Sequence, residues 1–146
     1  MSYVRFVLAV RDRDSGVDAG VFDTAYALRD DPAVAAADRA ALAEMLRWFD
    51  LNLATPTRFN RSRSKGYYRR TTRGIAWFRQ SASECLSRMH RLKEILEAYG
   101  HRVTVLEETR LGYVVYEDPH QVVAEPFADT RTGTRGRRRS RERPTR

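Results

Sequence analysis

The hydrophobic positions near the N-terminus of the chain alternate with polar or smaller residues. Over residues 3–10 one side of this alternation consists of Val4, Phe6, Leu8 and Val10. A period of two, carried by β-branched and aromatic residues, is typical of a strand with at least one buried face. We therefore predict a strand over residues 3–10. Residues 11–20 contain two glycines and three aspartates, and this composition predicts a connection.

Three later segments carry hydrophobic residues at helical spacing, which predicts three helices. The first begins at Val21 and runs to about Asp30, because the Asp31-Pro32 pair disfavours helical backbone. The second has a stripe formed by Leu42, Met45, Leu46, Phe49 and Leu53, and it ends before Pro56. The third has a stripe formed by Cys85, Met89, Leu92, Leu96 and Tyr99, and Gly100 supplies its stop.

After these helices the pattern predicts short strands over residues 101–106, 112–116 and 121–124. Their close spacing indicates two consecutive hairpins. The element order is then βαααβββ, which predicts one α+β domain over residues 1–128. This domain is expected to have an antiparallel four-stranded sheet with helices on one face. Trp77 and Phe78 are expected to anchor the chain ahead of the third helix.

The formal net charge of +8 is unevenly distributed along the 146 residues. Residues 126–146 contain eight arginines and two acidic residues, so this end carries +6. Residues 129–146 are nearly devoid of hydrophobic side chains, and we expect them to form a disordered basic tail. The other 125 residues carry a net charge of +2, which is also unevenly distributed. No acidic residue lies between Asp50 and Glu84, whereas eight cations do.

The acid-free window contains a basic segment, residues 57–75, which we expect to form a long loop. Arginine guanidinium groups match the geometry of phosphate, and aromatic rings stack on unpaired bases. This combination favours single-stranded nucleic acid or RNA over base-specific reading of a duplex. A solvated loop, an acidic protein partner and a small phosphorylated ligand remain alternatives. The predicted contacts are Arg58, Phe59, Arg61, Arg63, Lys65, Tyr67, Tyr68, Arg69, Arg70 and Arg73.

The tail adds a second basic patch at Arg137, Arg138 and Arg139. Cations on a disordered chain bind polyanions with strong salt dependence and little sequence preference. The tail is therefore expected to add attraction without specificity. A purely solubilising tail is the alternative.

Two segments of the chain resemble a family of small bacterial proteins that has no assigned activity. They are the hairpin from Gly112-Tyr113-Val114-Val115-Tyr116 to Pro126-Phe127 and the run Ser64-Lys65-Gly66-Tyr67. The resemblance covers about residues 3–130. It implies a bacterial, cytoplasmic origin and no catalytic residue.

Other chemistry is weakly supported by the sequence. The single cysteine, Cys85, excludes an internal disulfide, and no phosphate-binding loop, dinucleotide fingerprint or zinc-protease motif is present. Asp12, Asp14, Asp18 and Asp23 approach calcium-loop spacing but lack the required glycine and glutamate. An enzyme would need a pocket that gathers groups such as Arg73, Glu117 and His120; a nuclease site would use Glu107, Glu108, Glu117 and Asp118. We therefore predict no cofactor, metal or catalytic residue.

The sequence as a whole favours a non-enzymatic nucleic-acid-binding protein that uses the basic segment and the tail. The alternative is an interaction or regulatory module in which the basic segment docks on an acidic protein. No run of about 20 apolar residues is present, so a membrane partner is not expected.

Overall fold

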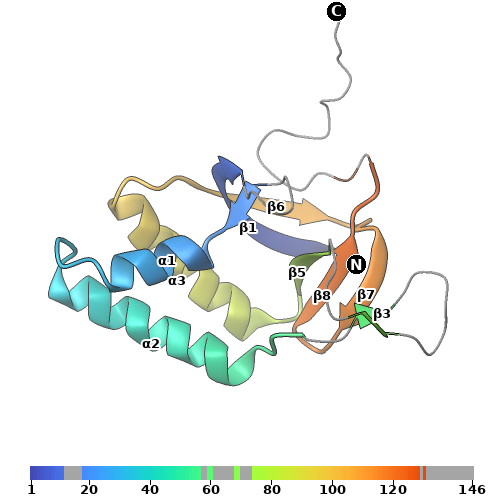
Figure 1. The fold of residues 1–146 in the computed structure, drawn as a ribbon, viewed down its shortest axis with the longest axis horizontal. Coiled ribbons are helices and arrows are strands. Elements are labelled where there is room, and N and C mark those ends of the chain that lie inside the picture. Colours follow the sequence, from blue (N-terminus) through green and yellow to red (C-terminus); the bar gives the residue numbers. More distant parts are fainter. Residues whose placement is uncertain (12–17, 57–58, 61–67, 70–73, 129, 131–146) are drawn as a thin grey trace, which may run out of the picture.

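The computed structural model describes residues 1–11, 18–56, 59–60, 68–69, 74–128 and 130. The predicted α+β class is confirmed, with an antiparallel sheet and three helices that lie on one side of it (Figure 1). The helices are α1 (Phe22–Arg29), α2 (Ala36–Asn52) and α3 (Ser83–Ala98). The main sheet contains β1 (Tyr3–Arg11), β2 (Asp18–Gly20), β5 (Ile75–Arg79), β6 (Val103–Glu108), β7 (Tyr113–Glu117) and β8 (Gln121–Glu125).

The long first strand, β1, organises the sheet because it pairs with three other strands. One of its edges pairs with β6, from Tyr3 opposite Glu108 to Leu8 opposite Val103. The other edge is divided between two partners. It pairs with β5 only at residues 3–4 and with β2 at residues 7–11. Beyond β5, the sheet continues through β8 to β7.

The prediction of four strands was wrong, because the described sheet has six. The missed central strand is β5, where Trp77 and Phe78 are buried side by side. Adjacent residues of a strand face opposite sides of the sheet, so this strand is buried on both sides and lacks a simple alternation. The other missed strand, β2, is an Asp-Ala-Gly tripeptide of low strand propensity that pairs with β1.

The predicted pair of consecutive hairpins was half right. β7 and β8 form a hairpin, but β6 pairs with β1 instead of β7. The connection between β6 and β7 carries Leu111, which is buried, and then passes Gly112 against the end of β8. Gly112 has a φ of +128°, and a Cβ at this position would lie 2.0 Å from the Glu125 carbonyl oxygen. The chain therefore needs glycine where it crosses to the far edge of the sheet.

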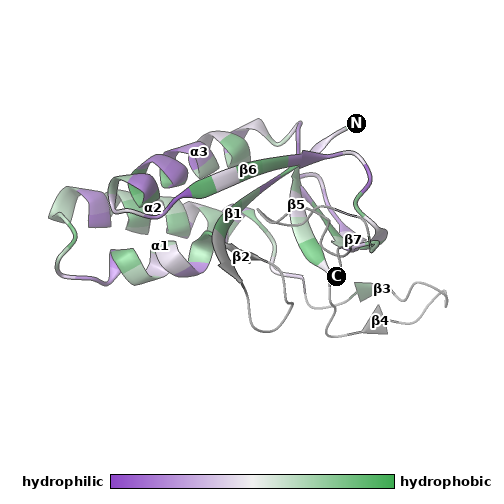
Figure 2. Ribbon diagram, turned by 90° about the horizontal axis from the view of Figure 1, so that it is seen from above, coloured by the Kyte–Doolittle hydropathy of each residue, from purple (hydrophilic) through white to green (hydrophobic). Residues whose placement is uncertain are grey.

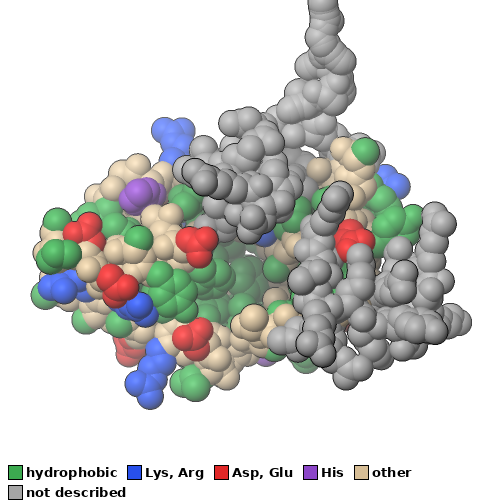
Figure 3. Space-filling model, in the orientation of Figure 1, with side chains coloured by type: hydrophobic (Ala, Val, Ile, Leu, Met, Phe, Trp, Pro, Cys, Tyr) green, Lys and Arg blue, Asp and Glu red, His purple; other side chains and the backbone are tan. Residues whose placement is uncertain are grey.

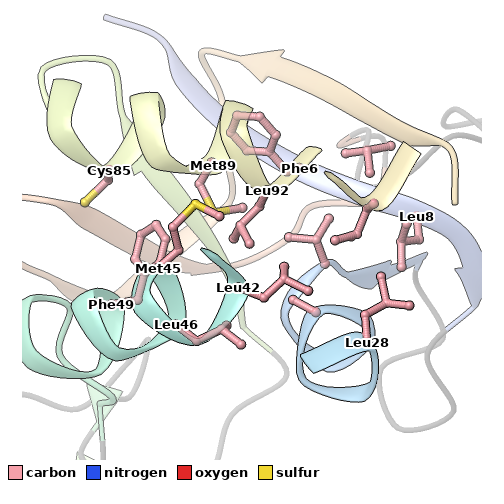
Figure 4. Close-up of a cluster of buried hydrophobic side chains, with 14 of the residues drawn as sticks. Phe6, Leu8, Leu28, Leu42, Met45, Leu46, Phe49, Cys85, Met89 and Leu92 are labelled. Carbon is pink, nitrogen blue, oxygen red and sulfur yellow. The ribbon is translucent and has the colours of Figure 1, made fainter. Parts of the chain in front are cut away.

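Both faces of the sheet are buried. The larger core lies between the helices and the sheet, where Phe6 and Leu8 of β1 meet Leu42, Met89 and Leu92 (Figure 4). The opposite face carries a smaller cluster composed of Val7, Ile75, Trp77, Leu106, Leu111, Val122 and Ala124. The helical stripes predicted from the sequence form the helix side of the larger core, which confirms those three helices.

Candidate nucleic-acid interface

The basic segment between α2 and β5 contains two short paired strands, β3 (Phe59–Asn60) and β4 (Tyr68–Arg69). Phe59 pairs with Arg69 and Asn60 pairs with Tyr68, in antiparallel register. The prediction of an uninterrupted loop is therefore corrected at these residues. Figure 2 shows β3 of this two-stranded ribbon beside β7, at the end of the molecule away from the helices.

Phe59 attaches the ribbon to the main sheet. Its side chain is only 8% exposed and belongs to a third hydrophobic cluster with Val115 and Val123, against which Tyr116 packs. A ring in this position packs against the protein and presents no open face for a base. The prediction that Phe59 stacks on a base is therefore corrected: Phe59 anchors the ribbon to the main sheet.

Most of the other predicted contacts lie outside the described residues. These are Arg58, Arg61, Arg63, Lys65, Tyr67, Arg70 and Arg73, together with Arg137, Arg138 and Arg139 of the tail. For Tyr68 and Arg69 the structure describes the backbone of β4. The role of these residues as nucleic-acid contacts stays a prediction.

The β7–β8 turn forms a polar frame beside the end of α2. Asp118 accepts hydrogen bonds from the backbone N–H groups of His120 and Gln121, at 2.8 and 3.0 Å, and from the Tyr116 hydroxyl at 2.8 Å. The Gln121 side chain donates to Asp118 at 3.2 Å and to the Ala54 carbonyl oxygen at 2.7 Å. The turn is thereby bound to the chain that leaves α2 for the basic segment.

These contacts determine the protonation of Asp118. Burial by itself would raise its pKa, but the His120 N–H, the Tyr116 hydroxyl and the amide groups of Gln121 together lower the pKa below its ordinary value. The hydrogen bond from the Tyr116 hydroxyl to the Asp118 carboxylate also raises the pKa of Tyr116, because it holds the phenol proton in place. Asp118 is therefore an ionised structural group, which argues against a proton-transfer role.

One cation of the acid-free window has an intramolecular role. Arg79 Nε donates to the Asp118 carbonyl oxygen at 2.7 Å, and Arg79 Nη2 lies 2.7 Å from Glu117 Oε1. Trp77, two residues earlier, is 1% exposed. The C-terminal end of the window is therefore part of the sheet and contributes neither a free charge nor an open ring.

The residues considered for catalysis do not form a site in the described part of the chain. Glu117 pairs with Arg79, whereas Arg73 lies outside the described residues. Cys85 is buried, and burial raises the pKa of its thiol, which disfavours the reactive thiolate. Within the described ranges no three His, Cys, Asp or Glu side chains gather in a way that would hold a metal ion.

A cavity that no sequence pattern predicts lies at the fork between β1 and β5. Their ladder ends after Val4 opposite Phe78, and the Arg5 guanidinium then donates from Nη1 to the Ala76 carbonyl oxygen at 3.1 Å. At this fork lies a cavity of about 160 Å³. Its lining consists of Arg5, Phe6, Val21, Phe22, Leu53, Ala76, Trp77, Phe78, Met89 and Gln121. Figure 3 shows a hollow floored by hydrophobic side chains where Figure 1 places the start of α1 opposite β5.

A second, wider depression of about 440 Å³ lies between α2 and α3. The Arg88 guanidinium covers the Trp48 ring, 4.1 Å from its centroid, and is also paired with Glu84. Leu51 is 73% exposed at the end of α2. The lining is composed of Glu44, Met45, Arg47, Trp48, Leu51, Ser87, Arg88 and Arg91, so three arginines face one glutamate.

Comparison of the chain with protein-family models, with curated proteins and with solved structures finds no match. None of the helices in the described ranges is long and apolar enough to cross a bilayer.

Proposed function

We propose that this protein binds single-stranded nucleic acid or structured RNA and catalyses no reaction. The observation that carries this proposal is the attachment of the acid-free basic segment to the sheet. The segment supplies cations without a competing carboxylate between Asp50 and Glu84, and the buried Phe59 anchors its ribbon on Val115 and Val123. A basic arm fixed at its base presents charge to a phosphate backbone at a lower entropic cost than a free tail.

The chemistry of the segment fits a flexible polyanion. Guanidinium groups donate paired hydrogen bonds to phosphate oxygens, and Tyr67 and Tyr68 supply rings for stacking on unpaired bases. The tail arginines at 137–139 add long-range attraction, which depends strongly on salt. The protein is not expected to read the sequence of a duplex, because the predicted contacts are mainly to phosphate and to the faces of bases.

Fluorescence anisotropy with a labelled oligonucleotide at several salt concentrations tests the proposal. Replacing Arg61, Arg63 and Arg70 by alanine is expected to weaken binding and to flatten the slope of log affinity against log salt by about 2, since each single-strand phosphate contact contributes about 0.7. The matched control replaces Arg47, Arg91 and Arg102, which are exposed outside the segment, and keeps the slope. Equal slopes for the two triple variants overturn the proposal.

A protein partner is the second candidate, and the depression between α2 and α3 favours it. Its arginines and the exposed Leu51 suit an acidic segment with an apolar side chain. A pull-down with and without nuclease separates the two candidates: nuclease removes partners held through nucleic acid and leaves direct protein partners. Loss of the retained partner in the Arg47, Arg91 and Arg102 variant would favour the depression as its docking site.

A further inference from the structure

Tyr113, the first residue of β7, carries an exposed aromatic ring. The residue is 55% exposed, whereas every other aromatic side chain that the structure describes is half-buried or buried. A single apolar side chain on a surface is ordinary by itself. The surroundings of Tyr113 therefore decide what its ring could contact.

The pairing of β7 with β8 places Tyr113 on the face of the sheet that carries the anchor of the basic ribbon. Tyr113 lies directly opposite Glu125, and opposite residues of antiparallel strands share a face. Glu125 and Val123 are two residues apart on β8, so they share that face as well. Val123 belongs to the cluster that buries Phe59, and β3 itself lies beside β7 (Figure 2). The exposed ring and the base of the ribbon thus lie on one face of the β7–β8 hairpin.

Phe127 supports the Tyr113 ring. The two ring centroids are 5.4 Å apart and the ring planes are inclined by 67°, which is an edge-to-face contact. The Arg110 guanidinium in turn lies over the Phe127 ring, 4.3 Å from its centroid. A ring that is already held in this way loses less conformational freedom when a ligand packs on it.

The charge beside Tyr113 favours a base over a phosphate as its contact. Glu125, opposite Tyr113 in the ladder, carries a carboxylate, and like charges repel. The predicted phosphate contacts lie instead in the basic segment, whose ribbon is anchored on the same face. A strand whose phosphates follow the basic segment would therefore turn an uncharged base towards Tyr113.

We propose that Tyr113 is a stacking platform for one unpaired base of a nucleic-acid strand whose phosphates bind the basic segment. This inference rests on the proposed function, and it adds a base contact on the main sheet, next to the anchor formed by Phe59. Stacking uses the face of a base and leaves its hydrogen-bonding edges unread, so the platform accepts any base. Phe127 acts as a positioning residue for the ring.

Fluorescence anisotropy with two labelled strands tests the stacking contact. One strand is an oligouridine, and the other is an abasic strand with the same number of phosphates. Tyr113→Leu is expected to weaken the binding of oligouridine by about fivefold or more and to leave the affinity for the abasic strand unchanged. The slope of log affinity against log salt is expected to stay the same, because no phosphate contact is lost.

Two matched variants show whether the loss comes from the ring. Tyr113→Phe keeps a ring without the hydroxyl and is expected to bind oligouridine as the wild type does. Val114→Ala changes the neighbouring residue, which is 46% exposed and lies opposite Ala124 on the other face of the sheet, and it is expected to have no effect. Thermal unfolding shows whether each variant is folded.

Photocrosslinking gives a measurement that needs no variant. The wild-type protein is irradiated in complex with oligouridine that contains 4-thiouridine, and the crosslinked residues are identified by mass spectrometry. A crosslink at Tyr113 is expected. If Tyr113→Leu does not fold, this experiment alone decides the proposal.

Several results would overturn the stacking contact. They are equal oligouridine affinities of the wild type and folded Tyr113→Leu, an equal loss for the abasic strand, a Tyr113→Phe variant as weak as Tyr113→Leu, and crosslinks that omit Tyr113. If one of these results accompanies a salt slope that depends on Arg61, Arg63 and Arg70, the proposed function stands and only the stacking contact fails. If neither strand binds the wild type, the proposed function itself fails and the stacking contact fails with it.

Discussion

The side chain of Arg5 bridges β1 to the carbonyl oxygen of Ala76 on β5, with a distance of 3.1 Å between Nη1 and the oxygen. The bridge lies where the backbone ladder between the two strands has ended after two pairs. A charged donor thus replaces backbone hydrogen bonds at the fork. The fork is what separates β5 from β1 and creates the cavity between them.

Replacement of Arg5 by methionine is expected to lower the free energy of unfolding by about 2 kcal/mol, because a hydrogen bond from a charged group contributes roughly 1.5–3 kcal/mol. Urea denaturation followed by circular dichroism measures the change. Arg102→Met, at an exposed position just before β6, is the control and is expected to change stability by less than about 0.5 kcal/mol. If the two variants lose similar amounts of unfolding free energy, the hydrogen bond from Arg5 to Ala76 does not stabilise the fold.

The helices could be predicted from the sequence because each has an uninterrupted apolar stripe, such as Leu42, Met45, Leu46 and Phe49 in α2. The strands were harder to predict, because their pairing depends on distant residues. Nothing near Val103 in the sequence indicates that it pairs with Leu8. The same limit applies to β2, which a three-residue sequence of weak propensity does not specify on its own.

The candidate sites also differ in how well they could be predicted from the sequence. The basic segment is a local property, because a run of cations without acids is visible in a single stretch of chain. The cavity is a long-range property, since Phe6, Leu53 and Gln121 meet only after the sheet and helices have packed. The burial of Phe59 also depends on distant partners, Val115 and Val123, and local composition gave it the opposite role.

Asp118 is expected to make stability depend on pH. Its pKa in the folded protein lies below the ordinary value of 3.8, so its carboxylate stabilises the fold above about pH 4, and this contribution is lost as the pH falls through the lowered pKa. Asp118→Asn is expected to cost about 2 kcal/mol at pH 7 and progressively less in acid. Denaturant melts at several pH values measure this difference. Glu94→Gln, an exposed carboxylate on α3, is expected to show no such trend; a constant cost for Asp118→Asn across the acid range would contradict the prediction.

Phe59→Ala tests how the anchoring of the basic segment affects binding when the number of cations is unchanged. Removal of a buried phenylalanine costs about 3 kcal/mol, although the site lies near the edge of the sheet and has room to relax. Because no cation is lost, oligonucleotide affinity is expected to fall while the salt slope stays the same. Anisotropy titrations of the folded variant check both quantities. A flattened slope would show that the anchor itself changes the number of phosphate contacts.

A comparison of Gly112 with Gly100 tests whether the connection from β6 to β7 needs glycine where it passes the end of β8. Both have positive φ, at +128° and +90°, but only at Gly112 would a Cβ meet backbone, the Glu125 carbonyl oxygen at 2.0 Å. Gly100→Ala is expected to cost about 1 kcal/mol from backbone strain alone. Gly112→Ala has to displace the end of β8 in addition, so we expect a loss of more than about 3 kcal/mol. Thermal and urea unfolding of the two variants compare these costs, and equal destabilisation would show that the close approach to Glu125 does not constrain the fold.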